Sequence, residues 1–185
     1  NHKNLTLKQL IKACKKNNIQ AQRDLYLKYK DDLYVLCLKY CKNVDEAQDN
    51  LQDSFIEIFK NIDKYNYDGS FEGWMKRITI NKAIDKYKSE SFINIIINDD
   101  ILEDTSIDSN EFQLPLHILL DLIQNLPDRY RLVFNLFELD NYSHKEISNL
   151  LSISEGTSKS NLHRAKLILK EKINEINTSQ NTLKN

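Results

Sequence analysis

The sequence predicts an all-α protein with two helical domains joined by an acidic linker, the C-terminal domain carrying a helix-turn-helix. Only 3 glycines and 2 prolines occur in 185 residues, which favours long helices over a turn-rich β architecture. Apolar residues recur every three or four positions along most of the chain. This period is lost between Glu90 and Glu111, where seven acids occur without a lysine or arginine. We expect an N-terminal domain over residues 1–89, a linker over 90–112, a C-terminal domain over 113–176 and a flexible tail over 177–185.

Four helices are expected in the N-terminal domain, where they form one compact bundle. Residues that can cap or interrupt a helix separate the four segments: Thr6 with Gln9, Asn17–Asn18, Asn43 with Glu46, and Ser70 after the Asp68–Gly69 turn. The second helix is expected from about Ala21 to Lys42, and the fourth should reach Tyr87. In the C-terminal domain the helical pattern returns over 116–126 and 130–139, with Pro127 in a first helical turn.

The composition limits which classes of function are open. The formal net charge is −1, so any nucleic-acid surface must come from local segregation of charge. Cys37 and Cys41 lie one helical turn apart on an apolar face, where buried thiols are more common than a metal site, and no histidine stands at ligand spacing. No phosphate loop, nucleophile motif or metal spacing occurs, so we expect no enzyme, no metal and no cofactor. Neither a membrane-spanning run nor a signal peptide is found, and we expect a cytoplasmic protein without membrane insertion.

Between Asn141 and Lys172 the sequence predicts a helix-turn-helix. Ser143 with Glu146 forms a capping-box pattern, Ser152-Ile153 is the expected turn, and Ser154 is placed to cap the second helix. On that helix one stripe is expected to point inward: Ser158, Leu162, Ala165 and Leu169. The opposite face is expected to point outward: Thr157, Ser160, Asn161 and Arg164, with Lys159, His163, Lys166 and Lys170 beside them.

Such a helix could be the charged half of an ordinary amphipathic hairpin. However, a helix N-terminus favours phosphate, small polar side chains can approach base edges, and arginine can bond guanine. Residues 154–172 also hold five bases against two acids. We therefore favour DNA binding over a merely solvated face.

The run LPDRYRLVFNLFELDNYSHKEISNLLSISEGTSKSNLHRAKLILKEKI closely resembles the C-terminal region of bacterial sigma factors of the extracytoplasmic-function (ECF) group. Members of that family carry three sequence motifs in this region: LP-x-RYR, one similar to YSYxEIA and one similar to ISEGTVKSRLHRAR. The resemblance implies a domain that reads the upstream, minus-thirty-five promoter element. The reading residues would be Gly156, Thr157, Lys159, Ser160, His163 and Arg164, with Asn161 standing where the family often has an arginine. Ser158 replaces a valine that the family usually buries, and this change is expected to loosen the packing slightly.

Two faces of opposite charge are expected in the N-terminal domain. Five acids and no base occur between Asp45 and Glu57, whereas residues 76–88 hold five bases and one acid. Taken alone, the acidic run is most simply a solvated face. The stretch DEAQDNLQDSFIEIFKNIDKYNYDGSFEGWMKRITINKAIDKYK resembles the other large region of the same family, so the resemblance covers nearly the whole chain apart from the linker and tail. It implies that the acidic helix docks the clamp helices of the RNA polymerase large subunit through Asp49, Gln52, Asp53 and Ile56.

Aromatic residues precede the basic helix, a combination that suits single-stranded bases. In the family, this loop and helix open the downstream, minus-ten element and trap an extruded base. The resemblance implies a pocket wall of Tyr67, Asp68, Ser70 and Phe71. It implies strand and duplex contacts by Arg77, Asn81 and Lys82, with Lys76 in the same basic segment. Trp74 is left open between a core position and a DNA contact.

The favoured hypothesis is an ECF-type sigma factor whose partners are core RNA polymerase, promoter DNA and an anti-sigma factor, with no small-molecule substrate. The acidic linker would thread toward the polymerase active-site channel and mimic nucleic acid there. The alternative is a stand-alone helix-turn-helix transcriptional regulator with an N-terminal helical sensor or dimerisation domain, which would bind an operator without polymerase. The opposed charged faces of the N-terminal domain favour the sigma factor.

Overall fold

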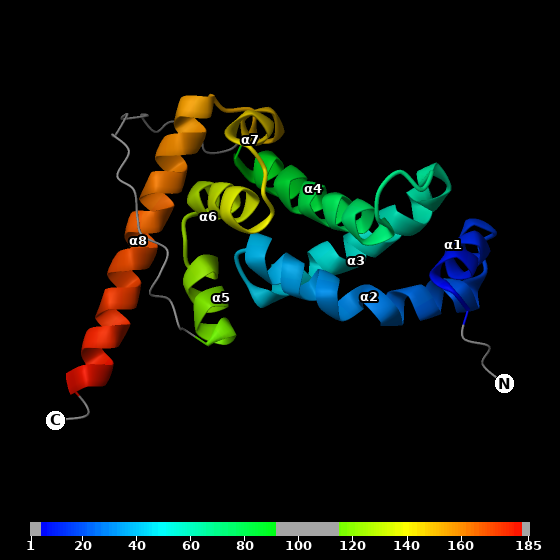
Figure 1. Cartoon of the computed structure of the whole chain (residues 1–185), viewed down its shortest axis with the longest axis horizontal. Coiled ribbons are helices and arrows are strands. Elements are labelled where there is room, and N and C mark those ends of the chain that lie inside the picture. Colours follow the sequence, from blue (N-terminus) through cyan, green and yellow to red (C-terminus); the bar gives the residue numbers. More distant parts are fainter. Residues whose placement is uncertain (1–4, 92–114, 183–185) are drawn as a thin grey trace. The chain divides into compact units, whose positions relative to one another are not determined.

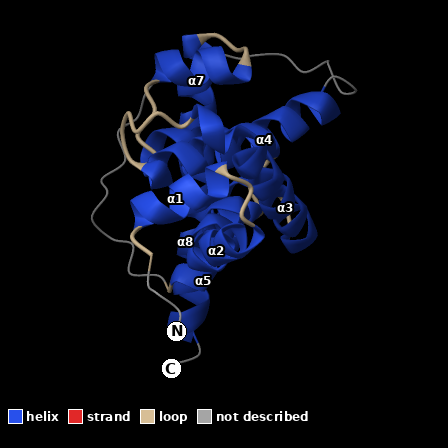
Figure 2. Ribbon diagram, turned by 90° about the vertical axis from the view of Figure 1, so that its right-hand side faces the viewer, coloured by secondary structure: helices blue, strands red, loops and turns tan. Residues whose placement is uncertain are grey.

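The computed structural model describes residues 5–91 and 115–182, which form eight α-helices, two short helical turns and no strand (Figures 1 and 2). The chain divides into two compact units, Asn1–Asp85 and Lys86–Asn185, which we call the N-terminal and C-terminal units. The predicted all-α class is confirmed. Of the predicted linker, residues 90 and 91 belong to the fourth helix, and residues 92–112 lie outside the described residues.

The N-terminal unit contains helices α1 to α3, the 3₁₀ turn η1 and most of α4. Their bounds are Leu7–Lys15 for α1, Ile19–Tyr40 for α2, Val44–Asn61 for α3, Ile62–Lys64 for η1 and Phe71–Ser91 for α4. Thr6 and Gln9 form the expected capping box at α1. The Asn18 side chain accepts a hydrogen bond at the start of α2, and the Ser70 hydroxyl accepts one from the Gly73 N–H of α4. Local capping chemistry therefore sets the helix starts in this unit.

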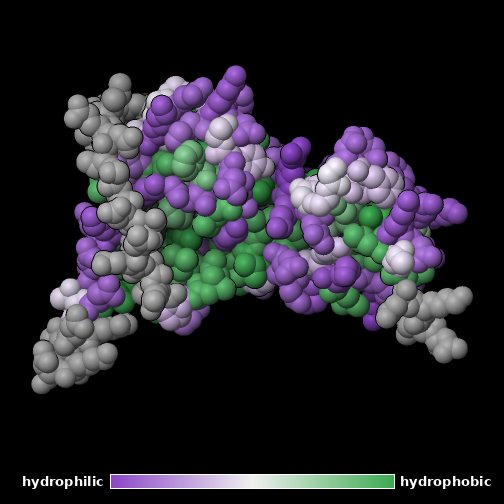
Figure 3. Space-filling model, in the orientation of Figure 1, coloured by the Kyte–Doolittle hydropathy of each residue, from purple (hydrophilic) through white to green (hydrophobic). Residues whose placement is uncertain are grey.

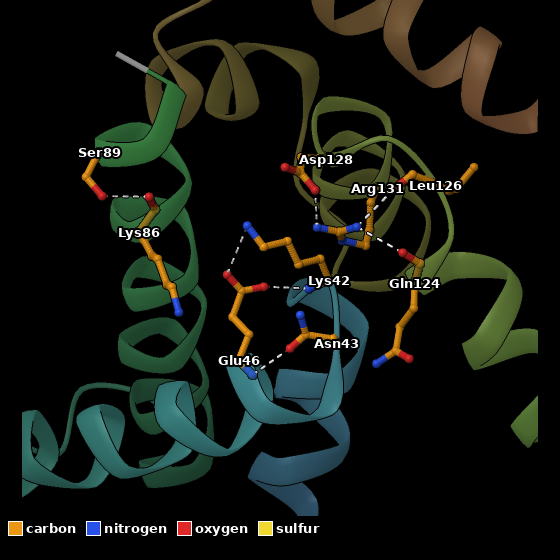
Figure 4. A network of polar contacts seen from close by, with 9 residues as sticks. All are labelled: Lys42, Asn43, Glu46, Lys86, Ser89, Gln124, Leu126, Asp128 and Arg131. Atoms are coloured by element: carbon orange, nitrogen blue, oxygen red, sulfur yellow. Dashed lines mark hydrogen bonds and ion pairs between the residues drawn. The ribbon is translucent and has the colours of Figure 1, made fainter. Parts of the chain in front are cut away.

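The junction between α2 and α3 is closed by a polar contact that Figure 4 shows in detail. The Asn43 side chain accepts a hydrogen bond from the Glu46 N–H at 2.8 Å, and the Glu46 carboxylate accepts one from the Lys42 N–H at 2.7 Å. The Lys42 ammonium lies 3.8 Å from the same carboxylate. Two backbone donors that the turn would leave unpaired are thus satisfied.

A buried asparagine joins the three long helices of the N-terminal unit. Asn50 of α3 is 4% exposed and donates from its amide to the Thr79 carbonyl of α4 at 3.2 Å and to the Cys37 sulfur of α2 at 3.4 Å. A buried amide is stable only when it is hydrogen-bonded. The contact therefore joins α2, α3 and α4 in the core, where the hydroxyl of the buried Ser54 also donates to the Asn50 carbonyl at 2.6 Å.

All three cysteines are buried as free thiols in this unit. Burial raises the pKa of Cys14 and of Cys37 to about 11. Within residues 5–91 and 115–182, His, Cys, Asp and Glu side chains form no cluster that could hold a metal ion. The thiols behave as small apolar core residues.

The C-terminal unit contains α5 to α8 and a π-helical segment. The bounds are Leu116–Gln124 for α5, Asp128–Phe134 for α6, Asn135–Leu139 for the π-helix η2, His144–Leu151 for α7 and Glu155–Thr182 for α8. Pro127 is the N-cap of α6, one position before the expected first turn. The predicted tail, residues 177–185, is helical as far as Thr182, and no glycine or proline interrupts α8 between Thr157 and that end.

Arg131 connects α5 to α6 inside the C-terminal unit (Figure 4). It is 4% exposed, and its guanidinium donates to the carbonyls of Gln124 and Leu126 at 3.0 Å and to the Asp128 carboxylate at 2.6 Å. The last carbonyls of a helix lack partners within the helix, and an arginine can satisfy them. The last arginine of the RYR motif is therefore structural here.

Apolar side chains cover part of the C-terminal unit. In Figure 3 hydrophobic residues reach the surface over α5, where Leu116 is 64% exposed and residues 118–120 are half-buried. Helix α8 packs on the α5–α6 connection through a buried cluster of Leu126, Ala165 and Leu169, and Tyr130 and Phe134 of α6 pack against this cluster. No helix in the described part of the chain is both long enough and apolar enough to cross a membrane.

Candidate nucleic-acid interface

Helices α7 and α8 form the predicted helix-turn-helix. The Ser143 hydroxyl accepts from the Glu146 N–H at 3.3 Å, and the Glu146 carboxylate accepts from the Ser143 N–H at 2.8 Å. Ser152 then adopts a left-handed backbone, with φ 57° and ψ 44°, which ends α7 and turns the chain. The Ser154 hydroxyl accepts from the Thr157 N–H at 2.9 Å, so α8 begins with a side-chain cap. The predicted capping pattern is confirmed at both helices.

The inward stripe of α8 packs as the sequence predicted. Ser158, Leu162, Ala165 and Leu169 are all buried. From α7, Ile147 and Leu151 are buried, while Leu150 is half-buried. This packing fixes the rotation of α8 about its own axis, so it decides which side chains α8 exposes.

The opposite face of α8 presents hydrogen-bond donors and positive charge. Six of the seven residues predicted to read the upstream element are exposed or half-buried: Gly156, Thr157, Lys159, Ser160, His163 and Arg164. The Thr157 hydroxyl lies 2.8 Å from the Ser154 hydroxyl, and the Ser160 hydroxyl donates to the Thr157 carbonyl at 3.1 Å. Beside this face, the Lys166 ammonium pairs with Glu138 at 2.7 Å. The arrangement suits a duplex groove that accepts a basic helix N-terminus.

Asn161 is the exception, since the sequence placed it on the outward face. In the structure it is buried, with 5% of its surface exposed. It stands three residues after Ser158 and four before Ala165, so the helical period places it on the flank of the inward stripe. The prediction that Asn161 points outward is therefore wrong.

Ser158 has a polar partner in the core of the helix-turn-helix. Its hydroxyl lies 2.9 Å from Nδ1 of His144, the first residue of α7. The imidazole also stacks on Phe137 of η2, with ring centroids 4.4 Å apart and an interplanar angle of 20°. The serine was expected to loosen the packing relative to a valine. Its hydroxyl is satisfied by a histidine that connects η2, α7 and α8, and the looser packing relative to a valine stays a prediction.

The loop between η1 and α4 exposes three of the four residues predicted for a base pocket. Tyr67, Asp68 and Ser70 are exposed, and Tyr67 is 43% exposed with φ 70°. The Asp68 N–H donates to the Asn66 side chain at 3.2 Å, and the Asn66 amide donates to the Asp68 carboxylate at 2.7 Å. The loop thus presents one aromatic ring beside polar groups.

Phe71 was predicted for the pocket wall, but it is a core residue with 3% exposure. Its ring lies 5.0 Å from that of Tyr65, 5.5 Å from that of Trp74 and 6.2 Å from that of Tyr29 on α2. As the first residue of α4 it projects into this aromatic cluster instead of into solvent. Because its ring is covered on several sides, Phe71 cannot form a free stacking surface for a base.

Trp74 joins the core and a surface cavity. It is half-buried and packs against Tyr65 and Phe71. It also lines a cavity of about 390 Å³ between α3 and α4, together with Glu57, Asn61, Lys64, Ile78, Asn81, Lys82 and Asp85. Trp74 can therefore be part of the core and still have a side-chain surface accessible at the cavity, so the two roles that the sequence left open, core residue and DNA contact, do not exclude each other. The structure brings Trp74, Asn81 and Lys82 together at this cavity, whereas Tyr67, Asp68 and Ser70 are not among its lining residues.

Charge at the cavity is partly paired. The Lys82 ammonium lies 3.4 Å from the Glu57 carboxylate, which also accepts from the Asn61 amide at 2.5 Å. The Asn61 hydrogen bond, aided by Lys82, lowers the pKa of Glu57. Lys76 and Arg77 are exposed on α4. Of the three lysines and arginines predicted to contact the downstream element, Lys76 and Arg77 are therefore exposed, whereas Lys82 is engaged by α3.

A separate face of α3 is acidic and exposed. Asp49, Gln52 and Asp53 are exposed, and Ile56 is 64% exposed although it is apolar. The core side of the same helix carries Ala47, Phe55 and Ile58. An exposed isoleucine flanked by acids is suited to docking against a basic and apolar partner surface.

Both units match known families. The model described as Sigma-70 region 2 matches residues 25–93, and the one described as Sigma-70, region 4 matches residues 116–169. The ECF RNA polymerase sigma factor SigW of Bacillus subtilis is 30% identical over 188 residues, which cover 93% of this chain and 99% of SigW. SigM of the same organism is 31% identical, covering 80% of this chain and 91% of SigM. This chain belongs to the ECF family of RNA polymerase sigma factors.

A solved structure supports the fold of this sigma factor. The sigma factor RpoE of Bartonella quintana, crystallised with the anti-sigma factor NepR, aligns with a TM-score of 0.51 and 16% identity. The alignment covers 80% of this chain and 94% of that one. At this identity the likeness shows the fold alone.

Sequence reasoning missed Asn50, which joins α2, α3 and α4. A signal was present, because Asn50 stands three residues after Ala47 and four before Ser54 on the buried side of α3. A polar residue on an apolar stripe predicts a buried hydrogen bond. Only the fold could supply its partners, the Thr79 carbonyl and the Cys37 sulfur.

Proposed function

We propose that this sigma factor binds core RNA polymerase through α3 and reads two promoter elements, one with each unit. The exposed face of α8 contacts the upstream element, and the loop 65–70 with α4 contacts the opened downstream element. It acts in the cytoplasm by binding, without a catalytic step, a cofactor or a small-molecule substrate. The acidic segment that follows α4 in the sequence connects the two activities along the chain.

The observation that carries this proposal is the match to both sigma regions, in order, together with the charge of the exposed faces. Asp45, Asp49 and Asp53 are exposed on α3, and Lys76 and Arg77 are exposed on α4. A stand-alone regulator would need only the helix-turn-helix. DNA binding by the helix-turn-helix alone would not explain why α3 of the N-terminal unit exposes several acids together with an isoleucine.

The test is transcription in vitro with core polymerase on a pool of genomic promoters, with and without this chain. We expect new, specific start sites only when the chain is present. Binding of an operator by the chain alone, without any gain of start sites with polymerase, would favour the regulator.

Docking through α3 is tested with two matched variants. Asp53→Asn should weaken binding to core polymerase, whereas Asp32→Asn changes an exposed acid of α2, a different helix from the one that carries the proposed face. Equal affinities for the two variants would contradict the proposed docking face. A change in the helical circular-dichroism signal would show that the fold, and not the contact, was altered.

We also propose an anti-sigma factor as a regulatory partner, because the Bartonella quintana relative was crystallised with one. The test is purification of the tagged chain from its own cells after membrane solubilisation. A partner that competes with core polymerase for this chain is the expected result, and recovery of polymerase alone would count against it.

A further inference from the structure

The loop that carries Tyr67 has a backbone that needs support. Tyr67 has φ 70° and Gly69 has φ 78°, a left-handed region that side-chain-bearing residues rarely adopt. Glycine accepts this geometry, but a tyrosine in it is strained and persists only where surrounding contacts hold it. Contacts elsewhere in the fold must therefore keep Tyr67 in place.

Part of the support comes from the loop itself. The buried Tyr65 donates its hydroxyl to the Gly69 carbonyl at 2.9 Å, and its N–H bonds to the Ile62 carbonyl at 3.2 Å. Its ring also lies 5.0 Å from that of Tyr67. These contacts fix Tyr65 relative to its neighbours, but they do not attach the loop to the first helix.

Lys15 makes that attachment. It is the last residue of α1, and its ammonium donates to the Tyr65 carbonyl at 2.6 Å and to the Asp63 carbonyl at 3.3 Å. The same ammonium lies 5.4 Å from the centre of the Tyr67 ring, and that of Lys8 lies 6.0 Å from it. Lys15 is half-buried. One side chain therefore bonds one carbonyl of η1 and one of the loop, and it faces the exposed aromatic ring.

We propose that Lys15 is a positioning residue for the loop 65–70 and the turn η1 before it, through which α1 takes part in recognising the single-stranded downstream element. The inference rests on the proposed function, in which this loop contacts that element. Bases stack on aromatic rings beside positive charge. Lys15 supplies that charge, and its hydrogen bonds help to keep the backbone of Tyr67 in the left-handed conformation that presents the ring. The sequence gives no signal for this role, because α1 lies 48 residues or more from the carbonyls it binds.

The experiment measures opening of the downstream element by holoenzyme, as permanganate reactivity of its thymines on a promoter selected in the transcription assay. Lys15→Met keeps the length of the side chain but removes its donors and charge. Lys16→Met removes the same charge from the exposed neighbouring residue and is the matched control. We expect Lys15→Met to reduce opening about tenfold, since one short charge-assisted hydrogen bond, the 2.6 Å contact with the Tyr65 carbonyl, amounts to roughly one tenfold step. The control should stay within about twofold.

Rescue separates positioning from a general loss of stability. Lys15→Arg keeps the charge and several donors and should restore most of the opening. Affinity for core polymerase and the thermal midpoint should change little in all three variants. Hydrogen exchange should become faster in peptides covering 62–70 for Lys15→Met alone. Opening by Lys15→Met within twofold of wild type, or equal losses for Lys15→Met and Lys16→Met, would overturn the proposal.

Tyr67→Ala distinguishes failure of this inference from failure of the proposed function. If Tyr67→Ala opens the element as wild type does, the loop does not contact it, and both proposals fail there. If Tyr67→Ala is defective and Lys15→Met is not, only the positioning role fails. Should Lys15→Met not fold, Lys15→Gln keeps a donor without charge, and about a threefold loss is expected. Wild-type opening by Lys15→Gln would overturn the role.

Discussion

The two proposed DNA-contacting surfaces are held in different ways. In the C-terminal unit the surface is one face of α8, whose start is set by the Ser154 cap and whose rotation is set by a buried stripe. In the N-terminal unit the surface is a short loop with two left-handed residues. Contacts from α1 and an aromatic cluster shared with α2 and α4 hold that loop.

This difference predicts different responses to substitution. A helix face is determined locally, so changing one exposed side chain removes one contact and leaves its neighbours in place. A loop held by distant residues loses its geometry when any of its supports is removed. Substitutions in the N-terminal unit should therefore separate into large losses at supporting residues and specific losses at Tyr67.

The largest effect is expected for Phe71→Ala. Because the ring is 3% exposed among Tyr65, Trp74 and Tyr29, its removal should lower the free energy of unfolding by about 3–5 kcal/mol. Urea denaturation followed by circular dichroism measures the change. Tyr67→Ala, at an exposed ring, should cost less than about 1 kcal/mol. Similar losses of unfolding free energy for the two variants would contradict the view that Phe71 supports the loop whereas Tyr67 only contacts DNA.

Arg164→Ala should weaken binding to the upstream element by about 1–3 kcal/mol, the value of a good arginine contact to a base. Holoenzyme binding to a promoter fragment, titrated at fixed salt, gives this value. Lys170→Ala, on an exposed position further along α8, is the control and should lower affinity similarly on all sequences. If Arg164→Ala loses affinity equally on cognate and altered upstream elements, the arginine contacts phosphate instead of a base.

A smaller effect is expected at the contact between His144 and Ser158. In a double-mutant cycle with His144→Ala and Ser158→Ala, the coupling free energy should be about 1 kcal/mol in the unfolding of the C-terminal unit. The same cycle measured on upstream-element affinity should show coupling of the same sign, since the bond connects α7 to α8. Additive effects of the two substitutions would mean that the hydrogen bond contributes nothing.

The smallest effect is a dependence on alkaline pH that is confined to the N-terminal unit, which holds all three cysteines. Burial raises the pKa of Cys14 and Cys37 from 9.0 to about 11. Between these values the unfolded chain has lost thiol protons that the folded chain keeps, so stability falls as pH rises. From pH 8 to pH 9 the loss should be roughly a few tenths of a kcal/mol per thiol.

Urea denaturation at the two pH values measures this loss, and Cys37→Ala should reduce it. A loss that is the same in Cys37→Ala and in wild type would show that other groups cause it. The C-terminal unit has no cysteine, so an equal loss of stability there would also show that groups other than the thiols cause it.

The sequence alone determined the features that depend on near neighbours. The caps at Thr6, Ser143 and Ser154, the class of the fold and the buried stripe of α8 follow from residues three or four positions apart. For the same reason six of the seven residues predicted to read the upstream element are accessible. Asn161 was misplaced because it stands at the edge of the stripe, where the helical period alone does not decide the side.

The tertiary structure decided what depends on residues far apart in the chain. It placed Phe71 in the core, gave Asn50 its partners on α2 and α4, and brought Lys15 to carbonyls 48 and 50 residues away. In the irregular loop, and at its junction with the first residue of α4, no preceding helical period relates position to direction, so the sequence does not decide whether an aromatic residue points inward or outward. Which side chain faces solvent there is settled by the packing of helices that the loop joins.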